Sequence, residues 1–359
     1  MSTNQKPTGP SRKGDHLDLC ITGDVAFRRK SNLFEEVELI HEPLPELALE
    51  EIDLTTTFAG KTLQAPLIIA AMTGGVERAN KINKDLAALA EEFGIGFAFG
   101  SQRPLLTKKI TAGYMVREEA PNALVLGNIG IVQAAESGTA AIEEMLQISG
   151  ADALCIHLNP AMELVQPEGD HDFRGGIETI QRLMEELPCP VIVKETGCGI
   201  GLATAKRLKK LGVKWVDVSG AGGTSWVAVE RHRAKEQKRN LGDTFWDWGI
   251  PTAASVAQIS DLKMGVCATG GIDNGLMIAK AISLGATCGG IARKFLQAHA
   301  TGGINETRQV IRQVIHEIRV ACLLCGAQKP IELQKKPIVI GANLRRWIPS
   351  ESSVLKRTF

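Results

Sequence analysis

Eight short apolar runs alternate with helical patterns along this chain, and this alternation constrains the fold most strongly. Short apolar runs bounded by turn residues are typical of buried strands, and intervening helices predict that the strands are parallel. Eight such units predict an α/β fold, a (β/α)8 TIM barrel with an N-terminal extension. An open doubly wound sheet is the alternative, but no G-x-G-x-x-G motif follows an early strand. The runs are 66–71, 95–99, 124–127, 153–156, 191–193, 215–218, 265–268 and 286–289.

The barrel prediction divides the 359 residues into four segments. We predict that residues 1–16 form a flexible basic arm. Residues 17–65 predict an N-terminal segment, with a small strand pair that turns at Ala59–Gly60. We predict that residues 66–326 form the barrel itself and that residues 327–359 form a C-terminal tail.

The basic cluster Arg12–His16 (RKGDH) follows a polar stretch, 1–11, whose composition predicts disorder. One interpretation is a solvated tail. The other is an arm that folds over an anionic ligand such as a diphosphate, because Arg binds phosphate in a bidentate manner.

Two loops, 162–176 and 220–249, exceed the usual length of a strand-to-helix connection. Long loops at the active-site end of a barrel are usually lids or ligand walls. The second loop contains the basic run 230–240, whose simplest interpretation is a solvated helix face.

The charge balance argues against several classes of function. Lys and Arg number 41 and Asp and Glu 40, giving a net charge of +1. This balance does not favour binding to nucleic acid or to an anionic membrane surface. There is no apolar run of about 18 residues, and the N-terminus lacks the apolar core of a signal peptide. The expected location is therefore cytoplasmic.

The eight cysteines are expected to be reduced and structural, because several lie inside apolar runs. Cys322 and Cys325 have C-x-x-C spacing at the end of a helical pattern that starts near Glu306. No second Cys or His pair follows to complete a zinc site. We therefore predict no metal or redox role for this pair.

Lys194 occupies the carboxyl end of the apolar run VIVKE, between Pro190 and Gly197. A lysine is rarely buried without an anionic partner. At the end of a barrel strand, where barrels place their chemistry, that partner would be a phosphate, a reduced flavin ring or a neighbouring acidic residue.

Paired glycines follow the last strands, at Gly222–Gly223, Gly270–Gly271 and Gly289–Gly290. Such loops expose backbone N–H groups, and in TIM barrels the last two loops commonly bind a phosphate. Together with a lysine beside the ring, this pattern predicts that the chain binds flavin mononucleotide (FMN).

Nine motifs extend over nearly the whole chain: RKGDH (12–16), AMTGG (71–75), GSQR (100–103), NIG (128–130), HLNPAMELVQPEGD (157–170), KETGCG (194–199), SGAGGTSW (219–226), DWGIPT (247–252) and ATGGIDNG (268–275). In this combination the chain resembles the type 2 isopentenyl-diphosphate delta-isomerases. These are FMN-dependent barrels that interconvert isopentenyl and dimethylallyl diphosphate by a 1,3-proton shift in isoprenoid biosynthesis. The resemblance also implies NADPH as the reductant of the flavin and a homo-oligomeric state.

The resemblance implies roles for individual residues. The FMN contacts would be Met72, Thr73, Gly74, Ser101, Asn128, Lys194, Ser219, Thr224, Gly270, Gly271, Ala292 and Arg293. The substrate contacts would be Arg12, Lys13, Ser101, Gln102 and Arg103 at the diphosphate, with Trp226 as a wall of the prenyl pocket. Glu163 would hold Mg²⁺, which suits one carboxylate combined with phosphate oxygens. The catalytic group would be Lys194, His157, Asn159 and Met162.

Met162 departs from the family pattern, which has glutamine at this position beside the reacting carbons. Methionine has no amide donor and no good acceptor. The chain is therefore either an isomerase in which the reduced flavin moves the proton, or a paralogue with lost or altered turnover. Gln166, four residues on, could replace the amide if the segment were helical, but Pro167 disfavours helical geometry there.

A second alternative is another FMN barrel, an α-hydroxy-acid oxidase. Those enzymes carry a histidine base in a Ser-x-His-Gly-Gly turn, whereas this chain reads Ser219-Gly220-Ala221-Gly222-Gly223. Ala221 therefore stands where the base would be, which argues against hydride abstraction from a hydroxy acid.

Overall fold

The computed structural model describes residues 9–358 apart from residues 73 and 76. Its centre is a closed barrel of parallel strands in the order β10-β11-β4-β5-β6-β7-β8-β9. The strands are β4 (Leu67–Ile69), β5 (Gly96–Ala98), β6 (Leu124–Gly130), β7 (Ala153–Leu158), β8 (Val191–Glu195), β9 (Trp215–Asp217), β10 (Gly265–Ala268) and β11 (Cys288–Ile291). The predicted TIM barrel is confirmed.

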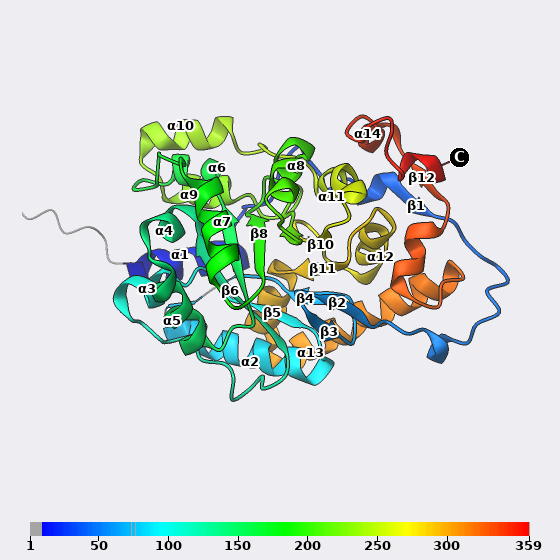
Figure 1. Ribbon diagram of the computed structural model, residues 1–359, viewed down its shortest axis with the longest axis horizontal. Helices are drawn as coiled ribbons and strands as arrows, with labels where there is room; N and C mark the ends of the chain where they lie inside the picture. Colours follow the sequence, from blue (N-terminus) through cyan, green and yellow to red (C-terminus); the bar gives the residue numbers. More distant parts are fainter. Residues whose placement is uncertain (1–8, 73, 76, 359) are drawn as a thin grey trace, which may run out of the picture.

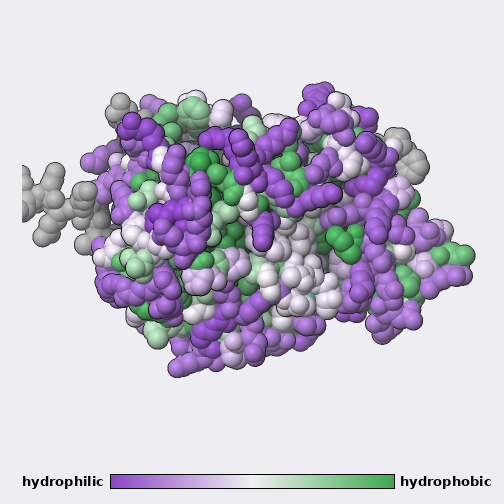
Figure 2. All heavy atoms as spheres, in the orientation of Figure 1, coloured by the Kyte–Doolittle hydropathy of each residue, from purple (hydrophilic) through white to green (hydrophobic). Residues whose placement is uncertain are grey.

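Helices surround the barrel and pack on its strands (Figure 1). They are α2 (Glu77–Phe93), α3 (Arg103–Lys108), α4 (Ile131–Glu136), α5 (Thr139–Ser149), α6 (Pro160–Val165), α7 (Gly176–Glu186), α8 (Leu202–Lys210), α9 (Trp226–Arg233), α10 (Glu236–Thr244), α11 (Thr252–Ile259), α12 (Gly275–Ser283) and α13 (Arg293–Leu324). Helix α13 is interrupted at Gly302 and Gly303, where the backbone leaves helical geometry. Most of the face in Figure 2 is hydrophilic, with apolar residues in small groups.

The segment before the barrel is more ordered than its composition suggests. The chain forms helix α1 (Gly9–Thr22), so the predicted disorder over 1–11 is wrong for residues 9–11, while residues 1–8 lie outside the described part. Helix α1 contacts α9 and α13 across the carboxyl end of the barrel. The predicted boundary between an arm and the next segment at residue 16 therefore falls inside one helix.

The opposite end of the barrel is closed by the hairpin of β2 (Thr56–Phe58) and β3 (Lys61–Leu63), which the sequence predicts. Ala59 and Gly60 both take positive φ in its turn. Phe58 and Leu63 are buried among the inward-facing side chains of the barrel strands. The hairpin thus completes the apolar core on the side away from the strand ends.

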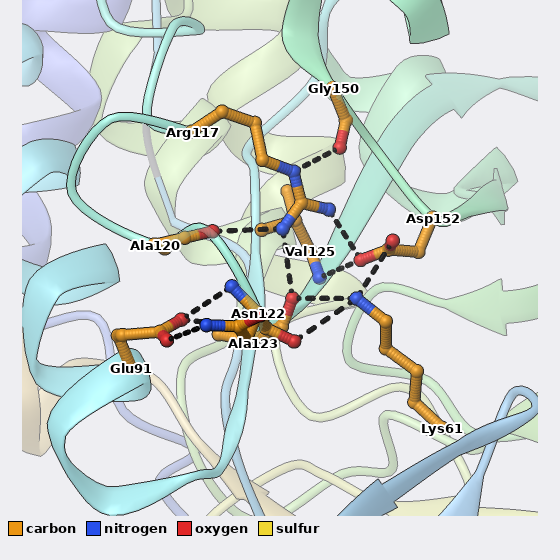
Figure 3. A network of polar contacts seen from close by, with 9 residues as sticks. All are labelled: Lys61, Glu91, Arg117, Ala120, Asn122, Ala123, Val125, Gly150 and Asp152. Carbon is orange, nitrogen blue, oxygen red and sulfur yellow. Dashed lines mark hydrogen bonds and ion pairs between the residues drawn. The ribbon is translucent and has the colours of Figure 1, made fainter.

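Figure 3 shows a polar network at this closed end, where β6 and β7 begin. Arg117 donates to the carbonyls of Gly150 (2.6 Å), Ala120 (2.8 Å) and Ala123 (3.0 Å), and it pairs with Asp152. Lys61 Nζ lies 2.9 Å from the other oxygen of Asp152. The network holds the loop before β6 and so stabilises the end of the barrel that carries no chemistry.

The C-terminal segment returns to the N-terminal one. β12 (Ile338–Ile340) pairs antiparallel with β1 (Val37–Leu39), with Val37 opposite Ile340. Short elements complete the chain: the 3-10 turns Phe34–Glu36, Leu49–Glu51, Ser260–Leu262, Pro330–Lys335 and Leu355–Arg357, and helix α14 (Ala342–Arg345). None of the described helices is long and apolar enough to cross a membrane.

Candidate active site

A cavity of about 490 Å³ opens at the carboxyl ends of the barrel strands. Every strand contributes to it, by its last residues or those just after them. These residues include Ala70, Ala71 and Met72 after β4, Gly100 and Ser101 after β5, Asn128 on β6, His157 on β7, Lys194 on β8, Asp217 on β9, Thr269 after β10 and Gly290 on β11. The location agrees with the general position of TIM-barrel active sites.

Most residues singled out from the sequence line this one cavity. They are Met72, Ser101, Arg103, Asn128, His157, Asn159, Met162, Glu163, Lys194, Ser219, Thr224, Trp226, Gly270, Gly271, Ala292 and Arg293. Gln102 does not: it is fully buried beside β6, where its Oε1 accepts the N–H of Asn128 at 2.9 Å. Gly74 lies against Tyr114 and is not in the lining. Thr73 and the side chains of Arg12 and Lys13 lie outside the described part.

Lys194 is only 7 % exposed and stands in register with Asp217 of β9. Its Nζ donates to the carbonyl of Glu195 at 2.6 Å, and within the described chain no ion pair is formed by Lys194. Asp217 accepts the Thr269 hydroxyl at 2.5 Å and the Ser219 N–H at 3.1 Å. Burial raises the pKa of Asp217, and the Lys194 charge opposes that rise. The cation is thus placed to meet an anionic ligand in the cavity.

Glu195, the next residue along β8, points away from that ligand position. Its carboxylate accepts the N–H groups of Thr196 (2.6 Å) and Cys198. Burial raises the pKa of Glu195 to about 7, and the backbone hydrogen bonds and Lys194 work against that rise.

The loops after β9 and β10 pack backbone against backbone. A Cβ added to Gly223 would lie 2.3 Å from the Gly271 nitrogen, and one added to Gly270 would lie 2.1 Å from the Gly220 oxygen. Only glycine permits the two loops to approach this closely. Helix α13 begins directly after β11 at Arg293, so its N-terminus also faces the cavity. Loops and helix together suit a phosphate.

Arg293 has a second set of contacts. Its guanidinium donates to the carbonyls of Cys20 and Gly23, both at 2.8 Å. Gln297, one turn further along α13, donates to the Ile21 carbonyl at 3.0 Å. The last carbonyls of helix α1 are therefore held by the same helix that begins at the cavity.

His16, Leu17 and Cys20 of helix α1 also line the cavity. His16 Nε2 lies 2.7 Å from Glu230 Oε1, and the His16 ring meets Trp226 edge-on at 5.4 Å. Glu230 is fully buried and also pairs with Arg233. The run 230–240 is thus more than a solvated face, because its first residue anchors α1 across the site.

Several polar side chains meet at the carboxyl ends of β6 and β7. His157 Nδ1 lies 2.8 Å from Asn128 Oδ1, and Asn128 donates to the Phe99 carbonyl at 2.8 Å. Asn159 donates to Glu163 Oε1 at 2.8 Å, and its Nδ2 lies 3.9 Å from Met162 Sδ. These contacts fix the orientation of each side chain toward the cavity.

Gln166 corrects one expectation. Its ψ of 135° shows the extended geometry that Pro167 imposes, and helix α6 ends before it, as the sequence predicts. Nevertheless, its side chain lines the same cavity as Met162 and Glu163. The loss of helical geometry therefore does not remove this amide from the site.

Four further residues line the cavity although the sequence analysis does not assign them to the site: Asp217, Thr269, Thr196 and Gln297. Asp217 ends β9 and Thr269 directly follows β10, so the strand-end rule could have identified both. Gln297 carried no such signal, because it comes from a helix that follows the barrel. Among the described residues, no group of three or more His, Cys, Asp or Glu side chains is arranged to hold a metal ion by itself. All eight cysteines are free thiols.

Comparison with known proteins first defines the class. The FMN-dependent dehydrogenase family matches residues 158–340. A solved structure of mandelate oxidase with (S)-2-phenylpropionate superposes with a TM-score of 0.64 at 16% identity, covering 91% of this chain and 94% of that chain. Another, with 3,3-difluoro-2-hydroxy-3-phenylpropionic acid, gives a TM-score of 0.62 at 16% identity, covering 92% and 98%. At this identity the structures share the fold, and the class is that of FMN-dependent barrels.

Curated relatives narrow the class. The isopentenyl-diphosphate delta-isomerase of Methanothermobacter thermautotrophicus is 43% identical over 94% of this chain and 95% of its own. That of Methanosarcina mazei is 42% identical over 95% and 94%. The chain belongs to the isopentenyl-diphosphate delta-isomerase family.

Proposed function

We propose that this protein is an FMN-dependent isomerase that interconverts isopentenyl diphosphate and dimethylallyl diphosphate. The observation that carries the proposal is the single cavity, in which a buried lysine, glycine loops suited to a phosphate and a carboxylate on α6 all meet. Two named isomerases that are 43% and 42% identical to this chain over nearly its whole length support the same reaction. The likeness to mandelate oxidase does not extend to its chemistry, because Ala221 is fully buried and does not reach the cavity.

The cavity fits FMN by the chemistry of its lining. Gly270, Gly271, Ala292 and Arg293 would hold the phosphate, and Lys194 would face the ring. Other contacts would come from Met72, Thr73, Gly74, Ser101, Asn128, Ser219 and Thr224. Bound in its reduced form, FMN would supply an electron-rich ring beside the reacting carbons. NADPH is our proposed reductant.

The substrate diphosphate would lie between helix α1 and the strand ends. Ser101 and Arg103 line this region, and Arg12 and Lys13 belong to helix α1. Gln102 would support this region indirectly, since its side-chain oxygen accepts the Asn128 N–H and its own N–H donates to the Asn128 carbonyl. Trp226 would wall the prenyl chain. The proposed Mg²⁺ would be held by Glu163 and diphosphate oxygens, which suits a hard cation with few protein ligands.

The protein side chains would orient the substrate and balance the charge of the flavin ring. Lys194 would balance negative charge at the ring, while His157 and Asn159, each fixed by a hydrogen bond, would orient the substrate. Met162 would present an apolar, polarizable surface to the alkene. In this scheme the amide of the family glutamine is dispensable, and the paralogue without turnover is not favoured. We also propose a cytoplasmic homo-oligomer that needs neither nucleic acid nor membrane.

The deciding assay incubates the purified protein with FMN, NADPH, Mg²⁺ and isopentenyl diphosphate in the absence of oxygen. We expect dimethylallyl diphosphate to form, and the Lys194→Met variant serves as the matched negative control. A wild type that binds FMN and becomes reduced but forms no dimethylallyl diphosphate would refute the proposal.

A further inference from the structure

Gln166 carries a buried amide whose oxygen has no hydrogen-bond partner in the described part of the chain. The residue is 2 % exposed and lines the cavity. Leaving a buried acceptor unsatisfied costs about 1–3 kcal/mol. The oxygen of Gln166 therefore points to a donor that the ligand-bound protein supplies.

The orientation of this amide is set by its neighbour Glu163. Gln166 Nε2 faces Glu163 Oε2 at 3.4 Å. Since an ionised carboxylate only accepts hydrogen bonds, the amide nitrogen must face Glu163 and the oxygen must face elsewhere. Lys238 of α10 donates to the Gln166 carbonyl, and the Gln166 N–H donates to the Met162 carbonyl at 3.0 Å. The backbone that carries the amide is thus held from two sides.

The loop after Gln166 returns onto Glu163. The N–H of Asp170 donates to Glu163 Oε2 at 3.0 Å. A Cβ added to Gly169 would lie 1.8 Å from the Glu163 carbonyl oxygen, so the loop can return this closely only with glycine there. Asn159 donates to the other carboxylate oxygen. Glu163 is therefore rigidly oriented at the cavity wall, with Gln166 directly beside it.

We propose that Gln166 is a positioning residue for hydrated Mg²⁺ at Glu163, and that its Oε1 accepts a hydrogen bond from a metal-bound water. The inference rests on the Mg²⁺ site given under the proposed function. Mg²⁺ usually keeps several of its waters, and such waters are strong donors. One side of the Gln166 amide would then hold the carboxylate ligand while the other holds a water on the same ion, which accounts for the unsatisfied oxygen.

The test measures metal binding rather than turnover. Mn²⁺, which takes the same oxygen ligands and is visible by electron paramagnetic resonance, is titrated into FMN-loaded protein with inorganic diphosphate. Loss of such an outer partner typically weakens metal binding by about 10–100-fold. We expect at least about a tenfold weaker Mn²⁺ affinity in Gln166→Leu, which keeps a side chain of similar size but has no acceptor oxygen. Leu164→Ala, at an exposed position of helix α6, should leave Mn²⁺ affinity unchanged.

Bound-flavin absorbance confirms that each variant is folded. Wild-type Mn²⁺ affinity in Gln166→Leu would overturn the inference, as would a wild type that binds no Mn²⁺. A wild type that binds Mn²⁺ but forms no dimethylallyl diphosphate would refute the proposed function and leave the Gln166 assignment standing.

Discussion

Lys194 and Asp217 occupy paired positions on neighbouring strands, so a buried cation and a buried carboxyl group share one side of the barrel mouth. The two residues are far apart in the sequence, and they become neighbours because β8 and β9 pair in parallel with Lys194 opposite Asp217. Each charge offsets part of the cost of burying the other. A substitution at Lys194 therefore changes both the charge seen by a ligand and the pKa of Asp217, which the lysine charge lowers.

Replacing Lys194 with methionine is expected to weaken FMN binding by at least about tenfold, corresponding to about 1.4 kcal/mol, and to abolish isomerisation. The reason is that the cavity loses its strand-end cation while Asp217 remains. Fluorescence titration of FMN measures the first effect. Lys209→Met, at an exposed position on α8, is the control and should bind FMN like the wild type. Equal FMN affinity in Lys194→Met and wild type would contradict this account.

Stability should depend on pH through Glu195. Burial raises the pKa of Glu195 from 4.5 to about 7, so between these values the folded protein binds a proton that the unfolded chain has lost. Stability from this group is therefore fully present below about pH 4.5 and declines as pH rises to about 7. At about 1.4 kcal/mol per pKa unit, the loss is a few kcal/mol. Urea unfolding of FMN-free protein from pH 5 to 8 measures it, and Glu195→Gln should abolish this part of the slope. Parallel curves for the two proteins would disprove the assignment.

Met162→Gln tests whether the missing amide matters. Positioned proton transfer contributes about 10²–10⁴ in rate. Because we assign no proton transfer to residue 162, the variant should change kcat by less than about tenfold. Steady-state kinetics with reduced FMN measures this change, with Met162→Leu as the apolar control. Activity that is absent in the wild type and appears only in Met162→Gln would show that the amide is obligatory.

Removal of residues 1–16 should raise KM for the diphosphate substrate or abolish turnover, with little change in FMN affinity. The deletion removes His16, which meets Glu230 across the cavity, but keeps the carbonyls of Cys20 and Gly23 that Arg293 binds. Deletion of residues 1–8 alone is the matched control and should retain wild-type kinetics. Unchanged KM in the longer deletion would show that this part of helix α1 plays no role in substrate binding.

The network at the closed end of the barrel should matter for stability alone. Arg117→Met removes three carbonyl contacts and leaves Asp152 with Lys61 as its remaining cation. We expect a loss of about 3 kcal/mol in the free energy of unfolding, with kcat unchanged. Arg174→Met breaks a pair whose arginine side chain is 91% exposed and should leave the free energy of unfolding nearly unchanged. Urea denaturation compares the two, and equal losses would contradict the prediction.

The barrel can be predicted from the sequence because each strand has a local sequence pattern of its own. An apolar run gives the buried segment, and a small or polar residue after it gives the strand end. The sequence predicts strand boundaries less accurately. The apolar run ends at residue 156, but β7 continues to Leu158 because it pairs with β8 through Glu195. Tertiary pairing extended both strands beyond their apolar cores.

Other features depend on contacts that no local pattern contains. Helix α1 has a polar composition with Gly9 and Pro10 at its start, and its buried residues Leu17 and Cys20 find partners only on the folded barrel. Local backbone rules exclude Gln166 from helix α6 and so predict that its side chain misses the site. Its side chain reaches the cavity through the path of the following loop, which depends on Gly169.

The pairing of β1 with β12 sets a condition on biosynthesis. Val37 is synthesised before every barrel strand, whereas its strand partner Ile340 is synthesised after all of them. Until then the edge of β1 is unpaired, and exposed strand edges are sites of intermolecular association. A chain that stalls or is cut before residue 338 would therefore contain every barrel strand and all the described residues of the cavity wall, but would leave β1 open to a second molecule.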